Sequence, residues 1–148
     1  MNETISHQLV THLPHGELLR PLIERLETET GGQITALVST GVINVLKNGD
    51  YFLYVDFNLK LNFDPSTSSG EATNLGLYEY QLFSIVWPPL GLRRFPLQLF
   101  IDESVLDEIA PGKMGFLDIE NAAQLAEALD RIMNAQTTKT LIEGIKAL

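Results

Sequence analysis

Histidines, carboxylates, arginines and tyrosines are the side chains here that could bind or transform a ligand. The three histidines, His7, His12 and His15, lie close together in the sequence. His12 and His15 have the three-residue spacing that places two metal ligands on one face of a helix. Pro14 lies between them and disrupts that helical geometry, and no other ligand type is placed nearby. We therefore expect exposed or capping histidines, no metal site and no cofactor.

Asp56 is the carboxylate whose position is most suggestive of a binding site. It is expected in the middle of a strand, opposite Gly41, with Tyr54 and Asn58 beside it on the same face. A glycine opposite an acid leaves space, and that space could admit a ligand. The alternative, which we favour, is that Asp56 lies on the solvated outer face of a half-exposed antiparallel sheet.

Motifs of nucleophilic or phosphate chemistry do not occur in the sequence. No serine lies in a Gly-x-Ser-x-Gly elbow, and there is no Gly-x-Gly-x-x-Gly or P-loop pattern. The chain has no cysteine, which excludes thiol catalysis, thiolate metal sites and disulfides. Arg93 and Arg94 lie in an expected turn, where they could bind a carboxylate-bearing partner or, more commonly, balance neighbouring acids. These observations favour a protein that is not an enzyme.

Aromatic residues indicate a possible interface. Phe52 and Tyr54 on the outer side of one expected strand, with Tyr78 and Tyr80 on another, could form a patch across adjacent strands. Tyrosine-rich patches are common at interfaces because they supply contact area at low entropic cost. The patch could instead be covered by residues 4–13 or by a second copy of the chain in a homodimer.

The charge balance limits the class of partner. Ten basic and 19 acidic residues give a formal net charge of −9 and a pI near 4.6. Such a charge repels nucleic acid and anionic membranes and suits a basic protein partner, although solubility alone is the commoner reason for acidity. No run approaches the 18 apolar residues that a membrane span needs. The N-terminal residues do not resemble a secretory signal, so we expect a cytoplasmic protein.

A long hairpin is the element expected to position these residues. Asn48-Gly49 lies between two runs that alternate apolar and polar residues, and this dipeptide is typical of a two-residue type I′ turn. Such a turn pairs Lys47 with Asp50 and sets the register of a hairpin over 33–63. The face expected to be buried then carries the pairs Ile34/Phe63, Ala36/Leu61, Val38/Leu59, Thr40/Phe57, Val42/Val55, Asn44/Leu53 and Leu46/Tyr51. The residues between them go to the opposite face, as the pairs Thr35/Asn62, Leu37/Lys60, Ser39/Asn58, Gly41/Asp56, Ile43/Tyr54 and Val45/Phe52.

Two further strands are expected after a surface loop at 64–74. The strand at 75–87 is apolar on both faces, which is typical of an interior strand or of one partly covered on its second face. One face carries Leu77, Phe83, Ile85 and Trp87, and the other carries Tyr78, Tyr80, Leu82 and Val86. The strand at 95–101 contains Pro96, which favours an edge position.

Helices are expected on both sides of the strand region. Their predicted ranges are 4–13, 17–30, 103–110 with Asp102 as N-cap, and a C-terminal helix capped by Asp118, with a break before 141–148. The spacing of apolar residues in the second and last of these predicts one buried helix face each.

These elements predict a single α+β domain over 1–148. Its sheet has four antiparallel strands, formed by the hairpin at 33–63 and the strands near 75–87 and 95–101, with the N- and C-terminal helices packed on one face. The function that fits best is a non-catalytic protein-binding module, such as an adaptor, a chaperone or an acidic inhibitor. One alternative is a small-molecule-binding protein or enzyme with a pocket near Asp56, Tyr54 and the 64–74 loop. Another is a structural subunit of a homo-oligomer.

Overall fold

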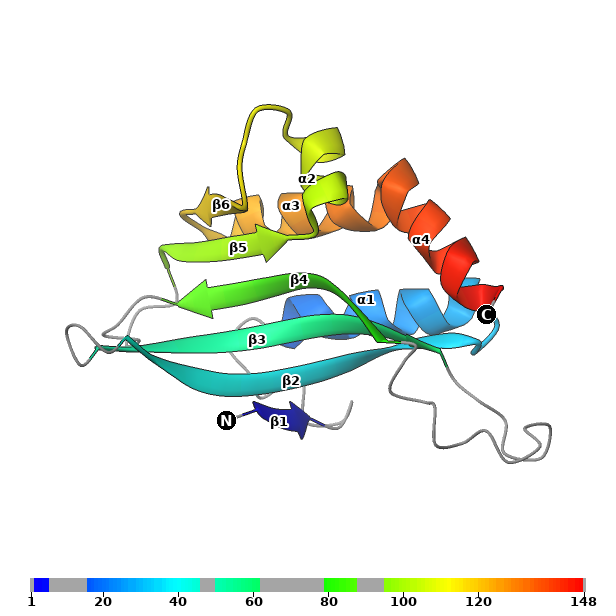
Figure 1. The fold of residues 1–148 in the computed structure, drawn as a ribbon, viewed down its shortest axis with the longest axis horizontal. Helices are drawn as coiled ribbons and strands as arrows, with labels where there is room; N and C mark the ends of the chain where they lie inside the picture. Colours follow the sequence, from blue (N-terminus) through cyan, green and yellow to red (C-terminus); the bar gives the residue numbers. More distant parts are fainter. Residues whose placement is uncertain (1, 6–15, 46–49, 62–78, 88–94, 148) are drawn as a thin grey trace.

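The computed structural model shows an α+β arrangement built on one antiparallel sheet (Figure 1). It describes residues 2–5, 16–45, 50–61, 79–87 and 95–147, and for 2–5, 43–45 and 50–52 it describes the backbone only. The elements are β1 (Asn2–Ile5), α1 (Gly16–Glu29), β2 (Ile34–Val45), β3 (Asp50–Leu61), β4 (Glu79–Trp87), β5 (Leu97–Ile101), α2 (Glu103–Ile109), β6 (Phe116–Ile119), α3 (Ala122–Asn134) and α4 (Gln136–Lys146). The strands are neighbours in chain order, from β1 to β6.

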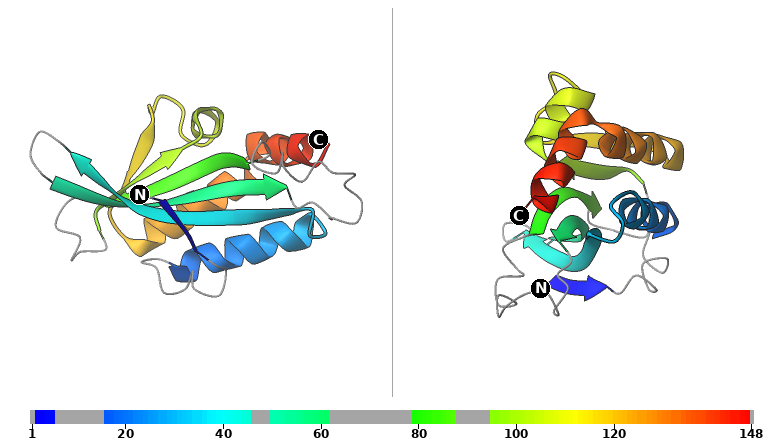
Figure 2. Two further views of the ribbon diagram at one scale, coloured as in Figure 1. Left: turned by 60° about the horizontal axis from the view of Figure 1, so that its bottom comes forward. Right: turned by 90° about the vertical axis from the view of Figure 1, so that its right-hand side faces the viewer.

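The helices build a layer on one face of the sheet. Figures 1 and 2 show α1 and α3 on the same side of it. Helix α1 packs on β2, while α4 contacts β2, β3, α2 and α3. The buried residues of α1 and α3 recur with helical spacing, namely Leu19, Leu22, Ile23, Leu26, Leu125, Ala128, Leu129, Ile132 and Met133. The expected helical layer from both ends of the chain is therefore confirmed.

The hairpin of β2 and β3 has the predicted faces but a different register. Asp50 pairs with Val45, where the prediction paired it with Lys47, so every partner shifts by two residues. Strand β2 ends at Val45 and β3 begins at Asp50, and the Asn48-Gly49 dipeptide itself lies outside the described residues. Because side chains alternate with a period of two, a shift by two keeps each one on its face. Hydrophobic alternation cannot distinguish registers that differ by two residues.

The helix-covered face of the hairpin is buried over most of its length. Phe57 is fully buried and stacks on Phe83 of β4, with ring centroids 4.7 Å apart and an interplanar angle of 9°. The burial weakens toward the hairpin tip, where Val42 is 50% exposed although it was expected in the core. We attribute the difference to the length of the strands, since twelve-residue strands extend beyond the helices that cover them.

A bulge changes which side chains of β4 face the helices. Phe57 pairs with Phe83, but the next residue of β3, Asn58, pairs with Gln81, so Leu82 is an extra residue. An extra residue reverses the inward–outward alternation beyond it. Tyr80 is therefore on the helix-covered face, where it packs against the core, and not on the outer face as predicted. Leu82 is also fully buried, which corrects its predicted place on the outer face.

In the part of the chain that the structure describes, the sheet has two more strands than the four predicted. Residues 2–5 form β1, which pairs antiparallel with β2, so the helix expected at 4–13 is wrong for its first two residues. The rest of that helix, residues 6–13, lies outside the described residues. The other additional strand is β6, which pairs with β5. Strands of four residues are too short for periodicity to show them in a sequence.

Strand β6 corrects two further predictions. Because it covers the second side of β5, that strand is interior and not an edge strand. Pro96 precedes Leu97, the first residue of β5, so its missing N–H is not required within the strand. Asp118 lies within β6 and caps no helix. Helix α3 is capped instead by Asn121, whose side chain accepts a 2.9 Å hydrogen bond from the backbone N–H of Gln124.

The C-terminal helix breaks at Ala135, earlier than the expected position before Leu141. Ala135 has extended backbone angles and no side chain that could cap α4. Glu108 of α2 takes that role from a distance. Its carboxylate accepts hydrogen bonds from the backbone N–H of Gln136 at 2.6 Å, and from the N–H and hydroxyl of Thr137 at 2.8 and 2.7 Å. The Thr137 hydroxyl, and then these backbone N–H groups, lower the pKa of Glu108.

Changing Glu108 to glutamine should destabilise the protein at neutral pH and do so less in acid. The folded-state pKa is lower than the ordinary value of 4.5, so the stabilisation is complete above pH 4.5. It is lost as the pH falls through the lowered folded-state value. Urea unfolding of wild type and Glu108→Gln over a pH series measures this, with Glu103→Gln on the same helix as control. A stability difference that does not shrink in acid would contradict the capping role.

Candidate functional site

The sheet face away from α1 and α3, here called the open face, brings side chains from five strands into two rows. Cross-strand pairing aligns Ser39, Asp56, Ser84, Phe100 and Phe116 in one row, and Gly41, Tyr54, Val86, Gln98 and Asp118 in the next. Side chains in such rows lie close enough to contact one another, because neighbouring strands are only about 4.7–4.9 Å apart. Residues distant in the sequence therefore form one continuous surface.

A hollow of about 430 Å³ lies in the middle of the open face. Its described lining residues come from three adjacent strands and are Tyr54, Asp56, Gln81, Ser84, Val86 and Phe100. The small side chain of Ser84 lies between the larger residues of its row, Asp56 and Phe100, which gives the hollow its depth. Tyr54 and Asp56, both predicted as site residues, are thus brought together in one cavity.

Asp56 is the only charged group among the described lining residues of this hollow. Its Oδ1 accepts a 2.6 Å hydrogen bond from the hydroxyl of Ser84, which is itself 6% exposed. The carboxylate makes no second hydrogen bond or ion pair to the described residues and is half-buried. It pairs with Ser39, while Gly41 pairs with Tyr54, so the predicted placement of Gly41 opposite Asp56 is corrected by the two-residue register shift.

The polar groups among the described lining residues include a serine hydroxyl and a carboxylate. A serine becomes a nucleophile when an adjacent base accepts its proton, and that base is most often histidine. Here the Ser84 hydroxyl donates to a carboxylate, and within the described residues no histidine lies beside the pair, because all three histidines fall in the segment 6–15. The described residues also contain no group of three or more histidine, aspartate or glutamate side chains that could hold a metal ion.

The structure separates Tyr80 from the other predicted site residues. The Tyr80 hydroxyl donates a short hydrogen bond to Oδ1 of Asp102, at the beginning of α2. This hydrogen bond, with burial and the negative charge of Asp102, raises the pKa of Tyr80 to about 12. Tyr80 therefore contributes to the attachment of α2 and not to the predicted aromatic patch.

Several predicted features of the site lie outside the described residues. They are Tyr78, Arg93, Arg94 and the 64–74 loop, together with the side chain of Phe52. The aromatic surface that the structure does describe is formed by residues the prediction missed. Phe100 and Phe116 lie on adjacent strands with ring centroids 5.1 Å apart. Phe100 alternates with the buried apolar residues of β5, so the sequence pattern predicts that its side chain points outward. Its neighbour Phe116 could not be predicted, because it lies on the unexpected strand β6.

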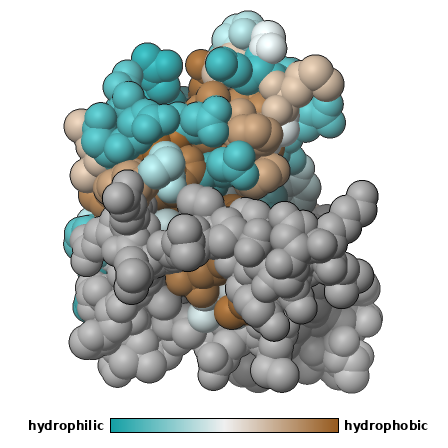
Figure 3. Space-filling model, turned by 90° about the vertical axis from the view of Figure 1, so that its left-hand side faces the viewer, coloured by the Kyte–Doolittle hydropathy of each residue, from teal (hydrophilic) through white to brown (hydrophobic). Residues whose placement is uncertain are grey.

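A second hollow of about 260 Å³ lies between the end of α2, strand β6 and helix α3. Its described lining combines the apolar residues Ile109, Ala110, Leu117, Ile119 and Ala128 with Asp118, Gln124, Glu127 and Arg131. Figure 3 shows apolar surface between polar side chains in its upper half, the level at which β6, α2 and α3 lie in Figure 1. Arg131 and Glu127 form an exposed ion pair at 3.0 Å. Arg131, the one cation among the described lining residues of this hollow, is thus already paired.

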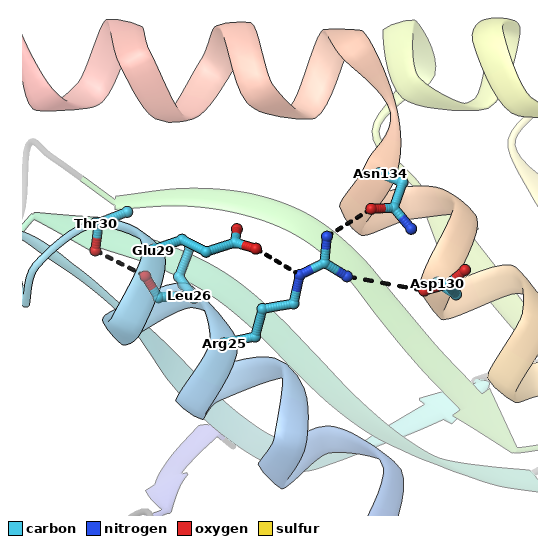
Figure 4. A network of polar contacts seen from close by, with 6 residues as sticks. All are labelled: Arg25, Leu26, Glu29, Thr30, Asp130 and Asn134. Atoms are coloured by element: carbon cyan, nitrogen blue, oxygen red, sulfur yellow. Dashed lines mark hydrogen bonds and ion pairs between the residues drawn. The ribbon is translucent and has the colours of Figure 1, made fainter.

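Another polar cluster has a structural role. Figure 4 shows Arg25 of α1 between its own helix and α3. Its Nε donates to Glu29 at 2.9 Å, one terminal nitrogen donates to Asn134 at 2.5 Å, and the other lies 3.8 Å from Asp130. The Arg25 side chain is only 31% exposed, and all its donor groups are directed at neighbouring side chains. The cluster therefore orients α1 against α3.

Comparisons with known proteins add no further constraint. No protein-family model, no curated protein and no solved structure matches this chain. None of the described helices has the length and apolar character needed to cross a membrane.

Proposed function

We propose that this protein is a non-catalytic binding module that recognises a basic protein partner through the open face. The observation that carries the proposal is the hollow, in which Tyr54, Val86 and Phe100 surround a half-buried carboxylate. Aromatic side chains at a sheet surface provide large contact areas, and interface hot spots are often aromatic. Phe100 remains 38% exposed, which is unusual for a phenylalanine on an interior strand.

Charge supports a basic partner. The formal net charge of −9 creates a field that accelerates encounter with a positively charged protein. Asp56 and Asp118 lie in adjacent rows of the open face, so this face shares the overall sign. Such a surface would suit an adaptor, a chaperone or an acidic inhibitor. The cysteine-free composition fits a reducing compartment such as the cytoplasm.

One observation favours a second candidate, a protein that binds a small molecule in the same hollow. Its volume of about 430 Å³ falls within the range of small-ligand pockets, about 300–1,000 Å³.

The third possibility is a homo-oligomer formed through the open face. It would bring two copies of Asp56 and two net charges of −9 together, and their repulsion opposes association.

The protein-binding function is tested by capture experiments with a variant of the open face. Immobilised wild type should capture a partner from a lysate of the native organism at low salt. A Tyr54→Ser/Phe100→Ser variant should bind the purified partner at least about tenfold more weakly, because hot-spot truncations cost more than about 1 kcal/mol each. Met114→Ser, which alters a residue that is 88% exposed outside the hollow, is the control.

Two results would contradict the proposal. One is equal binding of the purified partner by wild type and the open-face variant. The other is a wild-type dimer in light scattering that becomes a monomer in the open-face variant, because the face would then be covered by a second copy. Circular dichroism of each variant establishes that it is folded.

A further inference from the structure

The hollow on the open face has the features of a site for one cationic side chain. Three conditions define such a site in a protein surface: an anion that is partly desolvated, apolar or aromatic walls, and no cation of the protein already bound to the anion. The described residues of the hollow meet all three. This inference rests on the proposed protein-binding function and specifies what the open face recognises.

The anion is the carboxylate of Asp56. One of its oxygens accepts the hydroxyl of Ser84 at 2.6 Å, which orients the carboxylate, and the second oxygen has no partner among the described residues. Among the described residues of the hollow there is no lysine or arginine. The nearest lysine on the same strand face, Lys60, is four residues along β3 and pairs with Glu79 of β4. The negative charge of Asp56 is therefore not balanced by a described lining residue.

The walls are aromatic on two sides. Tyr54 is two residues from Asp56 on the same strand face, about 7 Å away along the strand. Phe100 lies two strands away in the same row, about 10 Å from Asp56, with the small Ser84 between them. The floor contains Ser84 and Val86, and Gln81 adds an amide at the rim. A flat, extended group can therefore enter between the two rings and reach the carboxylate.

We propose that the hollow binds an arginine side chain of the partner protein, with its guanidinium on Asp56 and its planar surface against Tyr54 or Phe100. Arginine fits better than lysine for three reasons. A guanidinium is less strongly hydrated than an ammonium, so it loses less on entering a half-buried hollow. It is planar and stacks on aromatic rings. It also has several donors, which can contact the second oxygen of Asp56 and the oxygen of Ser84 together.

The test uses the full chain and a matched set of peptides. Titration of acetyl-Gly-Arg-Gly-amide, followed by NMR, should shift the backbone amide signals of Tyr54, Ser84 and Phe100. The same peptide with citrulline, which has nearly the same shape but no charge, should bind at least tenfold more weakly. The lysine peptide should bind more weakly than the arginine peptide. Equal binding of the arginine and citrulline peptides would overturn the proposal.

Protein variants supply the second arm. Asp56→Asn removes the charge but keeps an oxygen that can accept the Ser84 hydroxyl, so the fold is retained. It should weaken binding of the arginine peptide at least tenfold. Asp107→Asn makes the same change in net charge at an exposed position on α2 and should leave binding unchanged. If both variants weaken binding equally, the effect comes from overall charge and the proposal is wrong.

The outcomes separate this inference from the proposed function. If the open-face variant loses the partner but the arginine peptide does not bind, the protein-binding function stands and the arginine site is wrong. If the arginine peptide binds at Asp56 but the open-face variant keeps the partner, the site stands and the proposed function is wrong. Free arginine that binds as tightly as the peptide would overturn the protein partner as the source of the guanidinium.

Discussion

Replacing Phe57 by alanine should lower the free energy of unfolding by about 3–5 kcal/mol, the range for a fully buried phenylalanine. Phe57 has no exposed surface and stacks on Phe83 at 4.7 Å. Its truncation leaves a cavity between the sheet and the helical layer, which removes both the burial of the ring and its contact with Phe83. Since small domains are stable by only about 5–15 kcal/mol, this is a large fraction of the total. Urea unfolding monitored by circular dichroism measures the change.

The matched control is Phe100→Ala, the same substitution on the opposite face of the same sheet. Phe100 is 38% exposed, so less surface returns to water when its ring is removed. We expect a loss below half of that for Phe57→Ala. Phe57→Leu, which retains most of the volume, provides a measurable value if the alanine variant does not fold. Equal losses for Phe57→Ala and Phe100→Ala would show that the assignment of the two faces is wrong.

Replacing Asp102 by alanine should lower the free energy of unfolding by about 2 kcal/mol, because one carboxylate makes two contacts. Its Oδ2 caps α2 by accepting the N–H of Val105 at 3.3 Å, and its Oδ1 accepts the hydroxyl of Tyr80. Loss of an N-cap costs about 0.5–2 kcal/mol, and loss of a hydrogen bond to a charged group up to about 1.5–3 kcal/mol when buried. The Tyr80–Asp102 hydrogen bond is partly exposed, so its loss should cost less than the value for a buried one. Tyr80→Phe should lose only the second contribution and should cause no further loss in the Asp102→Ala background.

The hydrogen bond between Tyr80 and Asp102 also makes the free energy of unfolding fall at alkaline pH. The folded-state pKa of Tyr80 is raised from 10.0 to about 12, so its contribution is complete below pH 10 and is lost as the pH rises through 12. Ultraviolet difference titration of wild type against Tyr80→Phe should show the Tyr80 ionisation near that value. In Asp102→Ala it should move back toward 10. Glu103→Ala, an exposed neighbour, is the control and should leave it in place. An unchanged ionisation in Asp102→Ala would contradict the assigned hydrogen bond.

Sequence patterns predicted the long elements well. The helix expected at 17–30 is α1, and the short helix after Asp102 is α2, with Asp102 as its N-cap. The two long strands and the identity of the buried face were also correct over most of their length, since Ala36, Val38 and Leu59 are fully or almost fully buried. Apolar alternation over twelve residues contains enough repeats to specify a strand and its inner face.

The predicted site was brought together only in part. Tyr54 and Asp56 share the hollow because they are two residues apart on one strand, a relationship that the sequence alone reveals. Tyr80 is absent from it because the extra residue Leu82 reverses the alternation of β4. A bulge leaves no clear pattern in a strand that is apolar on both faces. The sequence did not predict Phe116 as a site residue for another reason. Its strand has only four residues and is recognised by its pairing with β5, not by a pattern in the sequence.

The amino-acid sequence by itself determined the long helices and strands and most of their apolar faces, because propensity and periodicity are local properties of the chain. Tertiary structure alone decided the hairpin register, the bulge in β4, the addition of β1 and β6, and the capping of α4 by Glu108 from another helix. Each of these depends on contacts between residues that are distant in the sequence, and several alternatives have the same local pattern. The hollow at Asp56 belongs to this second group, because the carboxylate, the serine and the phenylalanine that form it lie on three different strands.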